Sequence, residues 1–350
     1  MAIDKKVLNV PHLRFPEFTE RWDTYRIADI LCIGNGRDYK HLSKGDIPVF
    51  GTGGYMTSVN ECLYEGETTF IGRKGTINKP FYYNGKFWTV DTLFYTHSFK
   101  RVIPKFVYCL FQTINWLRYN EASGVPSLSK DTIEKIKVRI PQLDEQKKIA
   151  KLLSLLDERI ATQNKIIEKL QSLIKGIAQN IVHRNKPNVR ISQCLECSSS
   201  TLQESDVLEC GAYPVYGANG VVGFLDNYNT SNEAIYIIKD GSGVGAVSYV
   251  AGKCSATGTL NILQAKKGFS LRYLYYLLNI FNFEPYKTGM AIPHIYFKDY
   301  GKAQIFCPSY SEQLKYAKFL ATIDDKLLTE QNVLINLSLL KQYLLRQMFI

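Results

Sequence analysis

The amino-acid sequence predicts an α+β protein built from two copies of one unit, each a strand-rich domain followed by a long helix. The first observation behind this prediction is an internal repeat, because residues 47–54 (IPVFGTGG) return as residues 213–220 (YPVYGANG). From Asp91 onward the two copies match at a constant offset of 167 residues. The second observation is that short β-branched and aromatic runs alternate with glycine turns early in each copy. The third is the heptad pattern of apolar residues that closes each copy.

The repeat divides the 350-residue chain into four segments. We expect the strand-rich domains at residues 1–143 and 185–310, and the long helices at residues 144–184 and 311–350. Asp144 and Ser311, each shortly after a proline, are the expected N-caps of the long helices. An amphipathic helix is expected late in each domain, over residues 106–117 and 273–281. Strands are expected at residues 47–50, 59–64, 68–72, 77–83 and 92–96, and in the second copy at 214–216, 221–225, 234–238, 245–250 and 259–263.

The long helices carry apolar residues spaced alternately four and three apart, the pattern of a coiled-coil seam. A helix of about 40 residues is about 60 Å long and needs a partner along its apolar face. Because the second domain lies between the helices in the sequence, we expect them to pack antiparallel and to hold the domains apart, as a dumbbell with a rough two-fold axis. One seam position is polar in both copies, Gln163 and Glu330, and we expect a polar layer that fixes the register. The other expected seam residues are Leu153, Leu156, Ile160, Ile167 and Leu170 in the first helix and Leu320, Ile323, Leu327, Leu334 and Leu337 in the second.

The charge favours a polyanionic partner, since 43 Lys and Arg residues against 32 Asp and Glu residues give a net charge of +11. The alternative is that this charge serves solubility alone. Residues 187–310 carry nine basic and nine acidic side chains, so the excess lies outside the second domain. No apolar run reaches the roughly 18 residues of a membrane span, and the first residues lack the apolar segment of a signal peptide. We therefore expect a cytoplasmic protein whose eight cysteines are free thiols.

The sequence carries no signature of catalysis. The glycine-rich turns at residues 51–54 and 241–245 lack the Gly-Lys-Ser/Thr of a phosphate loop and the acidic residue of a dinucleotide fold. There is no amino-methyltransferase tetrapeptide, no nuclease carboxylate cluster and no metal-ligand spacing among the five histidines. We therefore expect a non-catalytic protein that recognises a partner.

Two segments of each copy are candidates for nucleic-acid recognition. A tight turn carries Arg73 and Lys74 in the first copy and Lys239 and Asp240 in the second, so an acid replaces one cation. The loops at residues 123–130 and 288–298 gather glycine, proline, hydroxyl or aromatic groups and a lysine, and the first ends in a candidate helix start with phosphate-binding amides. A solvated hairpin tip and an ordinary loop that seats the long helix are the alternatives. The candidate contacts are Gly53, Tyr55, Arg73, Lys74, Thr76, Lys79, Ser127, Lys130, Asn219, Lys239, Ser242, His294, Tyr296 and Lys298.

Together these features resemble the specificity subunits of type I restriction–modification systems. The resemblance covers nearly the whole chain, and its second copy is the looser one, keeping residues 213–220 and Pro308 with Glu312 and Gln313. The segments that carry it in the first copy are 13–18 (LRFPEF) with Trp22, 47–54, 70–75 (FIGRKG), 90–94 (VDTLF) and 140–146 (IPQLDEQ) with the helix that follows.

The resemblance implies two target recognition domains, each reading half of an asymmetric, interrupted site in double-stranded DNA, with the long helices setting the gap. It implies two methylation subunits docked on the helices, which supply the S-adenosylmethionine site. It also implies restriction subunits that add ATP- and magnesium-dependent translocation and cleavage, so no cofactor is expected in this chain. The competing class is an orphan or decoy protein that binds methylation subunits without specific DNA recognition. A self-contained enzyme is disfavoured by the missing motifs.

Overall fold

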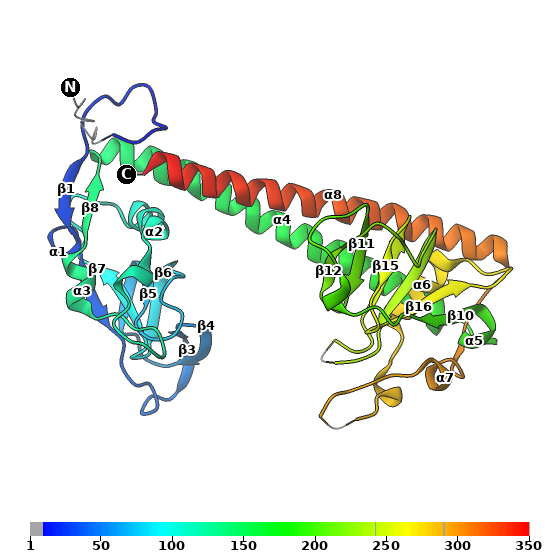
Figure 1. Cartoon of the computed structure of the whole chain (residues 1–350). Helices are drawn as coiled ribbons and strands as arrows, with labels where there is room; N and C mark the ends of the chain where they lie inside the picture. The colour runs from blue at the N-terminus through cyan, green and yellow to red at the C-terminus, as the bar shows by residue number, and fades with distance from the viewer. Residues whose placement is uncertain (1–9, 242, 290, 350) are drawn as a thin grey trace, which may run out of the picture. The chain divides into compact units, whose positions relative to one another are not determined.

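The computed structural model describes residues 10–241, 243–289 and 291–349, and the chain forms two compact units. Unit 1 combines the chain up to Gln163 with the residues from Val333 onward, and unit 2 comprises Asn164–Asn332. The two long helices, α4 (Leu143–His183) and α8 (Tyr310–Met348), are continuous, and each contributes one half to each unit (Figure 1). The division of the chain into recognition domains at 1–143 and 185–310 remains a prediction.

Unit 1 is built on a six-stranded sheet in the order β2-β7-β5-β6-β3-β4. Its neighbouring strands are antiparallel except for β3 and β6, which run parallel. A second, two-stranded sheet pairs β1 with β8. The strands are β1 (Asp23–Arg26), β2 (Cys32–Asn35), β3 (Lys44–Gly51), β4 (Gly54–Val59), β5 (Tyr64–Gly72), β6 (Phe81–Thr89), β7 (Leu93–His97) and β8 (Lys137–Ile140). The helices besides the long ones are α1 (Ile27–Ile30), α2 (Pro104–Thr113), α3 (Lys130–Lys135) and a 3-10 turn at Trp116–Tyr119.

Unit 2 repeats this plan with its strands in two sheets. The four-stranded order β10-β16-β13-β14 corresponds to β2-β7-β5-β6, and a separate three-stranded sheet, β12-β11-β15, corresponds to β4-β3-β6 and keeps the parallel pairing in β11 and β15. The single strand β6 of unit 1 is thus divided into β14 and β15 in unit 2. The strands are β9 (Val189–Arg190), β10 (Leu195–Ser199), β11 (Tyr213–Gly217), β12 (Gly220–Leu225), β13 (Glu233–Ile238), β14 (Val247–Ala251), β15 (Ser255–Ala256), β16 (Leu260–Ala265) and β17 (Gln304–Ile305). The helices are α5 (Ile191–Cys194), α6 (Leu271–Ile280), α7 (Phe297–Tyr300) and 3-10 turns at Glu204–Asp206 and Glu284–Tyr286.

Aromatic side chains from distant parts of the sequence form the core of unit 1. Trp22 and Phe349 meet edge to face at 6.1 Å, and Phe106 of α2 stacks on Phe349 at 5.4 Å. All three are buried, together with Ile149 and Leu153 from the first turns of α4. The beginning of α4 and the end of α8 therefore pack against the same domain. The two helices run antiparallel within this unit.

A buried glutamine fixes the start of α4. Gln146 accepts a hydrogen bond from the backbone N–H of Ile103, the N-cap of α2, at 3.1 Å. Its amide donates to the carbonyl of Pro141 at 2.8 Å and to that of Arg101 at 2.9 Å. One side chain thus satisfies three backbone groups that the fold removes from water.

Unit 2 builds the same clamp at the positions 167 residues later. Gln313 of α8 is buried, accepts from the N–H of Ser270 at 2.9 Å and donates to the carbonyl of Pro308 at 2.9 Å. Ser270 is the N-cap of α6, the counterpart of Ile103. The glutamine of the repeated Glu-Gln pair is therefore a structural residue in both copies.

The neighbouring glutamate takes a different role in each unit. Glu145 is buried and forms two hydrogen bonds of 2.7 Å with the Arg14 guanidinium, which anchors the N-terminal segment. Glu312 is exposed and accepts from the hydroxyl of Ser309 at 2.6 Å and from its N–H at 3.2 Å. These bonds from Ser309 to Glu312 hold the helix start at Tyr310. The predicted caps Asp144 and Ser311 are therefore wrong, because both lie inside the first turn.

The expected seam residues are all buried or half-buried in the structure. Gln163 is among the most buried of them, and Glu330 is half-buried and forms an ion pair with Lys326. At one seam position unit 1 has an ion pair in place of an apolar pair, because Lys341 of α8 lies 2.5 Å from Asp157 of α4. In unit 2, Ile181 of α4 and Leu320 of α8 lie in one apolar core.

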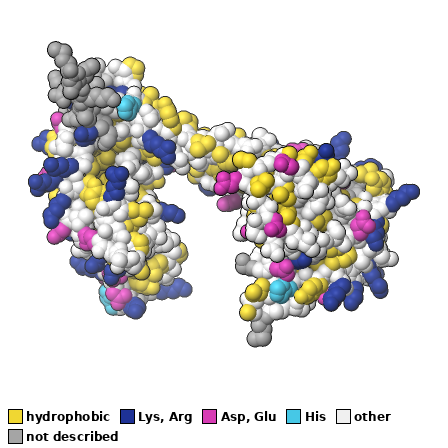
Figure 2. Space-filling view, viewed as in Figure 1, with side chains coloured by type: hydrophobic (Ala, Val, Ile, Leu, Met, Phe, Trp, Pro, Cys, Tyr) yellow, Lys and Arg dark blue, Asp and Glu magenta, His cyan; other side chains and the backbone are white. Residues whose placement is uncertain are grey.

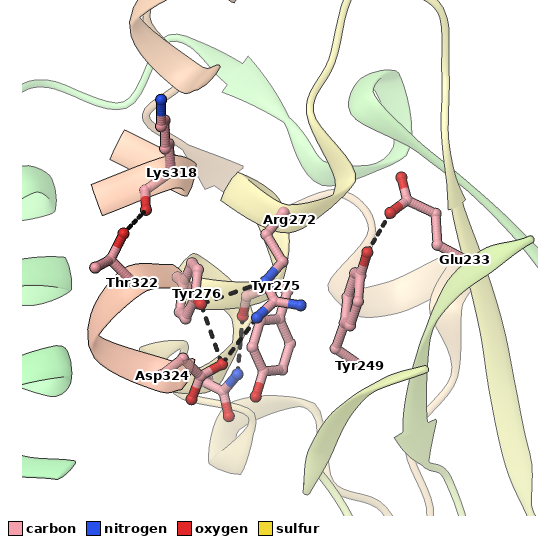
Figure 3. A network of polar contacts seen from close by, with 9 residues as sticks. Glu233, Tyr249, Arg272, Tyr275, Tyr276, Lys318, Thr322 and Asp324 are labelled. Carbon is pink, nitrogen blue, oxygen red and sulfur yellow. Dashed lines mark hydrogen bonds and ion pairs between the residues drawn. The ribbon is translucent and has the colours of Figure 1, made fainter. Parts of the chain in front are cut away.

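A polar network ties α8 to the sheet of unit 2 (Figure 3). Asp324 accepts hydrogen bonds from the guanidinium of Arg272 and from the hydroxyl of Tyr276, both at 3.1 Å. The Arg272 guanidinium also lies 4.3 Å from the ring centroid of Tyr249, whose hydroxyl donates to Glu233. Burial, and to a lesser extent the bond to Glu233, raises the pKa of Tyr249, so the phenol keeps its proton.

Unit 1 holds the counterpart of this network. Lys105 lies 5.7 Å from the ring of Tyr82, and the Tyr82 hydroxyl donates to Glu67. Tyr82 contacts Tyr108, with 6.1 Å between the ring centroids, and Lys341 lies 5.7 Å from the ring of Tyr108. The same kinds of residue therefore link sheet, short helix and long helix in both units.

Three of the expected elements are misplaced. Residues 60–63 form a connection between β4 and β5 instead of a strand, and Ile77 is buried in the turn before β6. Helix α2 ends at Thr113 instead of reaching Leu117, because Ile114 is extended and the Trp116 indole donates to the carbonyl of Phe111 at 2.9 Å. Further strands are additional to those expected, since they are short and lack a clear apolar alternation: β1, β2, β8, β9, β10, β15 and β17.

Replacing Gln146 or Gln313 by alanine should lower the free energy of unfolding by roughly 2–4 kcal/mol, because each change leaves buried backbone groups without partners. Thermal and urea unfolding measure this decrease. Gln342→Ala, at an exposed site of α8, is the matched control and should be nearly neutral. A glutamine variant as stable as this control would show that the clamp does not hold the helix start.

Candidate nucleic-acid interface

The turn after β5 in unit 1 is hydrogen-bonded on both sides. The N–H of Arg73 donates to the carbonyl of Thr92 at 2.8 Å, and the Arg73 carbonyl accepts from the N–H of Leu128 at 2.9 Å. The N–H of Gly75 donates to the carbonyl of Pro126 at 2.8 Å. The loop at 123–130 therefore pairs with the turn, with Lys74 directly opposite Ser127.

Unit 2 repeats these bonds one by one. The N–H of Lys239 donates to Thr259 at 3.0 Å, and the Lys239 carbonyl accepts from Ile295 at 2.9 Å. The N–H of Gly241 donates to Pro293 at 3.0 Å, and Asp240 lies opposite His294. The structure thus brings together, in each unit, the turn and the loop that the sequence singled out separately.

Glycine is required at one position of each turn. Gly75 has φ of +84° and Gly241 has φ of +95°, a region that side chains strain. This backbone lets the chain reverse while the residue before the glycine stays paired with the loop. Lys74 and Asp240 therefore occupy equivalent positions in the two units. We call this arrangement of paired turn and loop the turn–loop frame, formed by residues 73–75 with 123–130 in unit 1 and by residues 239–241 with 288–298 in unit 2.

Four predicted contacts of unit 1 line one hollow of about 390 Å³: Arg73, Lys74, Ser127 and Lys130. The Arg73 guanidinium donates to the carbonyl of Asp91, 3.3 Å from Nη1, and lies 5.8 Å from the ring of Phe94. Lys74 is exposed. Asn35, Glu121 and Phe94 also line the hollow, and no local pattern in the sequence pointed to them.

The start of α3, where phosphate-binding amides are predicted, has an internal carboxylate beside its N-cap, Ser129. The Glu121 carboxylate accepts from the N–H of Ser129 at 3.3 Å and from its hydroxyl at 2.7 Å, and it also accepts from the Thr132 hydroxyl. The bonds from Thr132 and then Ser129 lower the pKa of Glu121. Glu121 thus holds the N-cap residue and the Thr132 hydroxyl of this helix start.

The remaining predicted contacts of unit 1 lie outside this turn and loop. Gly53 lies in the β3–β4 turn, and Tyr55, in β4, is exposed with its hydroxyl 3.1 Å from that of Ser58. A second hollow, of about 810 Å³, includes Gly53, Asp91 and Thr92, so it adjoins the backbone that supports Arg73. Thr76 and Lys79 are exposed in the connection from β5 to β6.

In unit 2 the turn and loop carry different side chains. His294 Nδ1 lies 2.7 Å from Asp240 Oδ1, whereas unit 1 has Ser127 and Lys74 at these places. Tyr296 is exposed, with Lys298 5.3 Å from its ring, and Lys239 is half-buried. Asn219 is in the β11–β12 turn, the counterpart of the turn that holds Gly53. Ser242 lies outside the described residues.

The sequence identified Asp240 only as a missing cation and did not indicate its partner. The repeat aligns Lys74 with Asp240 and Ser127 with His294, but only the fold shows that the two positions face each other. Figure 2 shows Lys and Arg side chains over both units on the visible face, with acidic side chains among them. The arrangement can present hydrogen-bond donors from unit 1 and both donors and acceptors from unit 2.

The described residues hold no group of three or more His, Cys, Asp or Glu side chains suited to a metal ion. In the same part of the chain, no helix has the length and apolar character needed to cross a bilayer.

Known proteins repeat this architecture. The family model of the type I restriction modification DNA specificity domain matches residues 19–172 and 188–337. The MjaVIII type I restriction enzyme specificity subunit of Methanocaldococcus jannaschii is 34% identical over 123 residues, which are 34% of this chain and 27% of that protein. The EcoprrI specificity subunit of Escherichia coli is 25% identical over 129 residues, 37% of this chain and 31% of that protein. The matches thus span less than a third of the length of these curated relatives.

A crystal structure of a type I restriction–modification S subunit from M. genitalium shares the fold, with a TM-score of 0.73 at 17% identity over 97% of this chain and 99% of that one. The two matches of the family model fall on the two copies of the repeat and together cover most of the chain. This chain therefore belongs to the family of type I restriction–modification DNA specificity domains.

Proposed function

We propose that this chain is the non-catalytic specificity subunit of a type I restriction–modification complex, and that each unit reads one half of an interrupted DNA site. The observation that carries the proposal is the turn–loop frame, which is built twice from the same backbone hydrogen bonds and bears different side chains. A protein that reads two different half-sites needs this combination of a fixed frame and variable tips.

The side chains at the frame suit contacts to DNA. Arg73 and Lys74 present donors that fit phosphate oxygens or the O6 and N7 acceptors of guanine. The backbone of the turn is used internally, so the tip is rigid and its side chains are positioned before DNA arrives. The net charge of +11 supplies long-range attraction to a polyanion.

The long helices are proposed to set the distance between the recognition domains at 1–143 and 185–310 and to dock two methylation subunits. Exposed apolar side chains on α8 support the docking role, because water-facing apolar surface of this extent favours a partner. They include Leu314, Phe319, Leu328, Ile335, Leu339 and Tyr343. In this scheme S-adenosylmethionine binds to the methylation subunits, and ATP and magnesium serve restriction subunits in a cytoplasmic complex.

Co-expression with the methylation subunit of the same system in a methylation-free host tests the function. Single-molecule sequencing of the host DNA should reveal modified adenines in a bipartite, interrupted motif. A stable complex that modifies no adenine would instead favour a decoy or inactive variant.

Replacing Lys74 by alanine, alone or with Arg73→Ala, should weaken DNA binding by about 1–3 kcal/mol for each side chain that no longer bonds to a base. The change should relax sequence preference in the half-site read by unit 1 only. Competition binding with DNA altered in one half-site at a time measures this. Lys137→Ala, at an exposed position of β8, is the charge-matched control. Equal relaxation of both half-sites would mean that Arg73 and Lys74 contact phosphates.

Inserting one heptad after Gln163 and one after Glu330 should lengthen each helix by about 10 Å while keeping the seam in phase. The expected result is a longer gap in the modified motif or a loss of binding, because two major-groove readers must stay in phase with the DNA helix. An insertion in only one helix is the control, since it breaks the seam register. An unchanged gap at unchanged affinity would rule out the spacer role.

A further inference from the structure

The two units place opposite charges at the same point of the turn–loop frame. Lys74 faces Ser127 in unit 1, and Asp240 faces His294 in unit 2. The turn after β13 and the loop at 288–298 lie at one end of unit 2 (Figure 1). The equivalence rests on matching backbone hydrogen bonds, so it does not depend on the sequence alignment alone.

The Asp240 carboxylate is oriented and still has accepting capacity. Its Oδ1 lies 2.7 Å from His294 Nδ1, which must carry the hydrogen because an ionised carboxylate has none to donate. Among the residues that the structure describes, none donates a hydrogen bond to Oδ2. Both side chains are 36% exposed, so a partner can reach the pair from solvent.

A carboxylate at this place does not suit a phosphate contact. Phosphates are anionic, and an acid facing them lowers the affinity for any DNA sequence. The bases offer a better match in the major groove, where cytosine presents its N4 amino donor and guanine and thymine present carbonyl acceptors. Adenine has an N6 donor, but its neighbouring N7 acceptor would face the acid.

We propose that Asp240, positioned by His294, determines the specificity of unit 2 by accepting a hydrogen bond from the N4 amino group of a cytosine. The inference rests on the proposed function and deepens it. At the equivalent position of unit 1, Lys74 presents hydrogen-bond donors instead of acceptors. Donors at this position suit the O6 and N7 acceptors of guanine. His294 acts as a positioning residue, because its ring fixes the direction of the carboxylate.

The test is selection of binding sites from a randomised duplex library by the complex of this chain with its methylation subunits. The wild-type complex should enrich a bipartite motif with cytosine at one position of the half-site read by unit 2. Asp240→Asn should reduce the preference for cytosine at that position roughly 5- to 100-fold and favour adenine, since an amide both accepts from N6 and donates to N7. Glu209→Gln, which removes one exposed acidic charge elsewhere in unit 2, should leave the motif unchanged.

A second variant guards against loss of folding. Asp240→Lys combined with His294→Ser introduces the pair that unit 1 already carries in the same frame, and it should convert the preference from cytosine to guanine. If the wild-type motif appears and neither variant changes it, the inference is wrong and the proposed function stands. If the wild-type complex enriches no motif, the proposed function fails and the inference fails with it.

Discussion

The structure depends on two buried amide side chains, Gln146 and Gln313. Each joins the beginning of a long helix to the N-cap of a short helix, α2 in unit 1 and α6 in unit 2. A buried glutamine with unmet hydrogen bonds is costly, so the geometry that satisfies it is strongly selected over alternatives. The clamp thereby fixes the direction in which each long helix leaves its domain. The direction of the helix at this point also determines which face of the helix carries the apolar seam further along.

Divergence between the units is concentrated away from this clamp. The network of acid, tyrosine and cation that links sheet to helices survives in both copies, with Lys105 replaced by Arg272. The backbone frame of turn and loop also survives, while the residues it presents have changed from Lys74 to Asp240 and from Ser127 to His294. Because the interior is the same in both units and only the side chains at the turn and loop differ, one fold can recognise two different targets.

The sequence predicted the parts of the fold that depend on periodic burial. The heptad seam and the repeat are visible because apolar residues recur at fixed spacing, so the long helices lie within a residue or two of their expected bounds. The strands predicted at 59–64 and 77–83 are only partly present, because residues 60–63 connect β4 to β5 and Ile77 is buried in the turn before β6. The pairing of turn with loop was not predictable, since Gly75 and Pro126 meet through long-range backbone bonds that leave no local pattern. The Asp240–His294 pair was missed for the same reason.

Unit 1 is assembled from both ends of the described chain, and unit 2 from a continuous stretch between them. The N–H of Leu13 donates to the carbonyl of Gln347 at 2.9 Å, so these two distant segments meet on one domain. During synthesis, unit 2 leaves the ribosome complete, whereas the core around Trp22 must wait for Phe349. The domain that is synthesised first therefore completes its core last. Until then its apolar surface is exposed and must not aggregate.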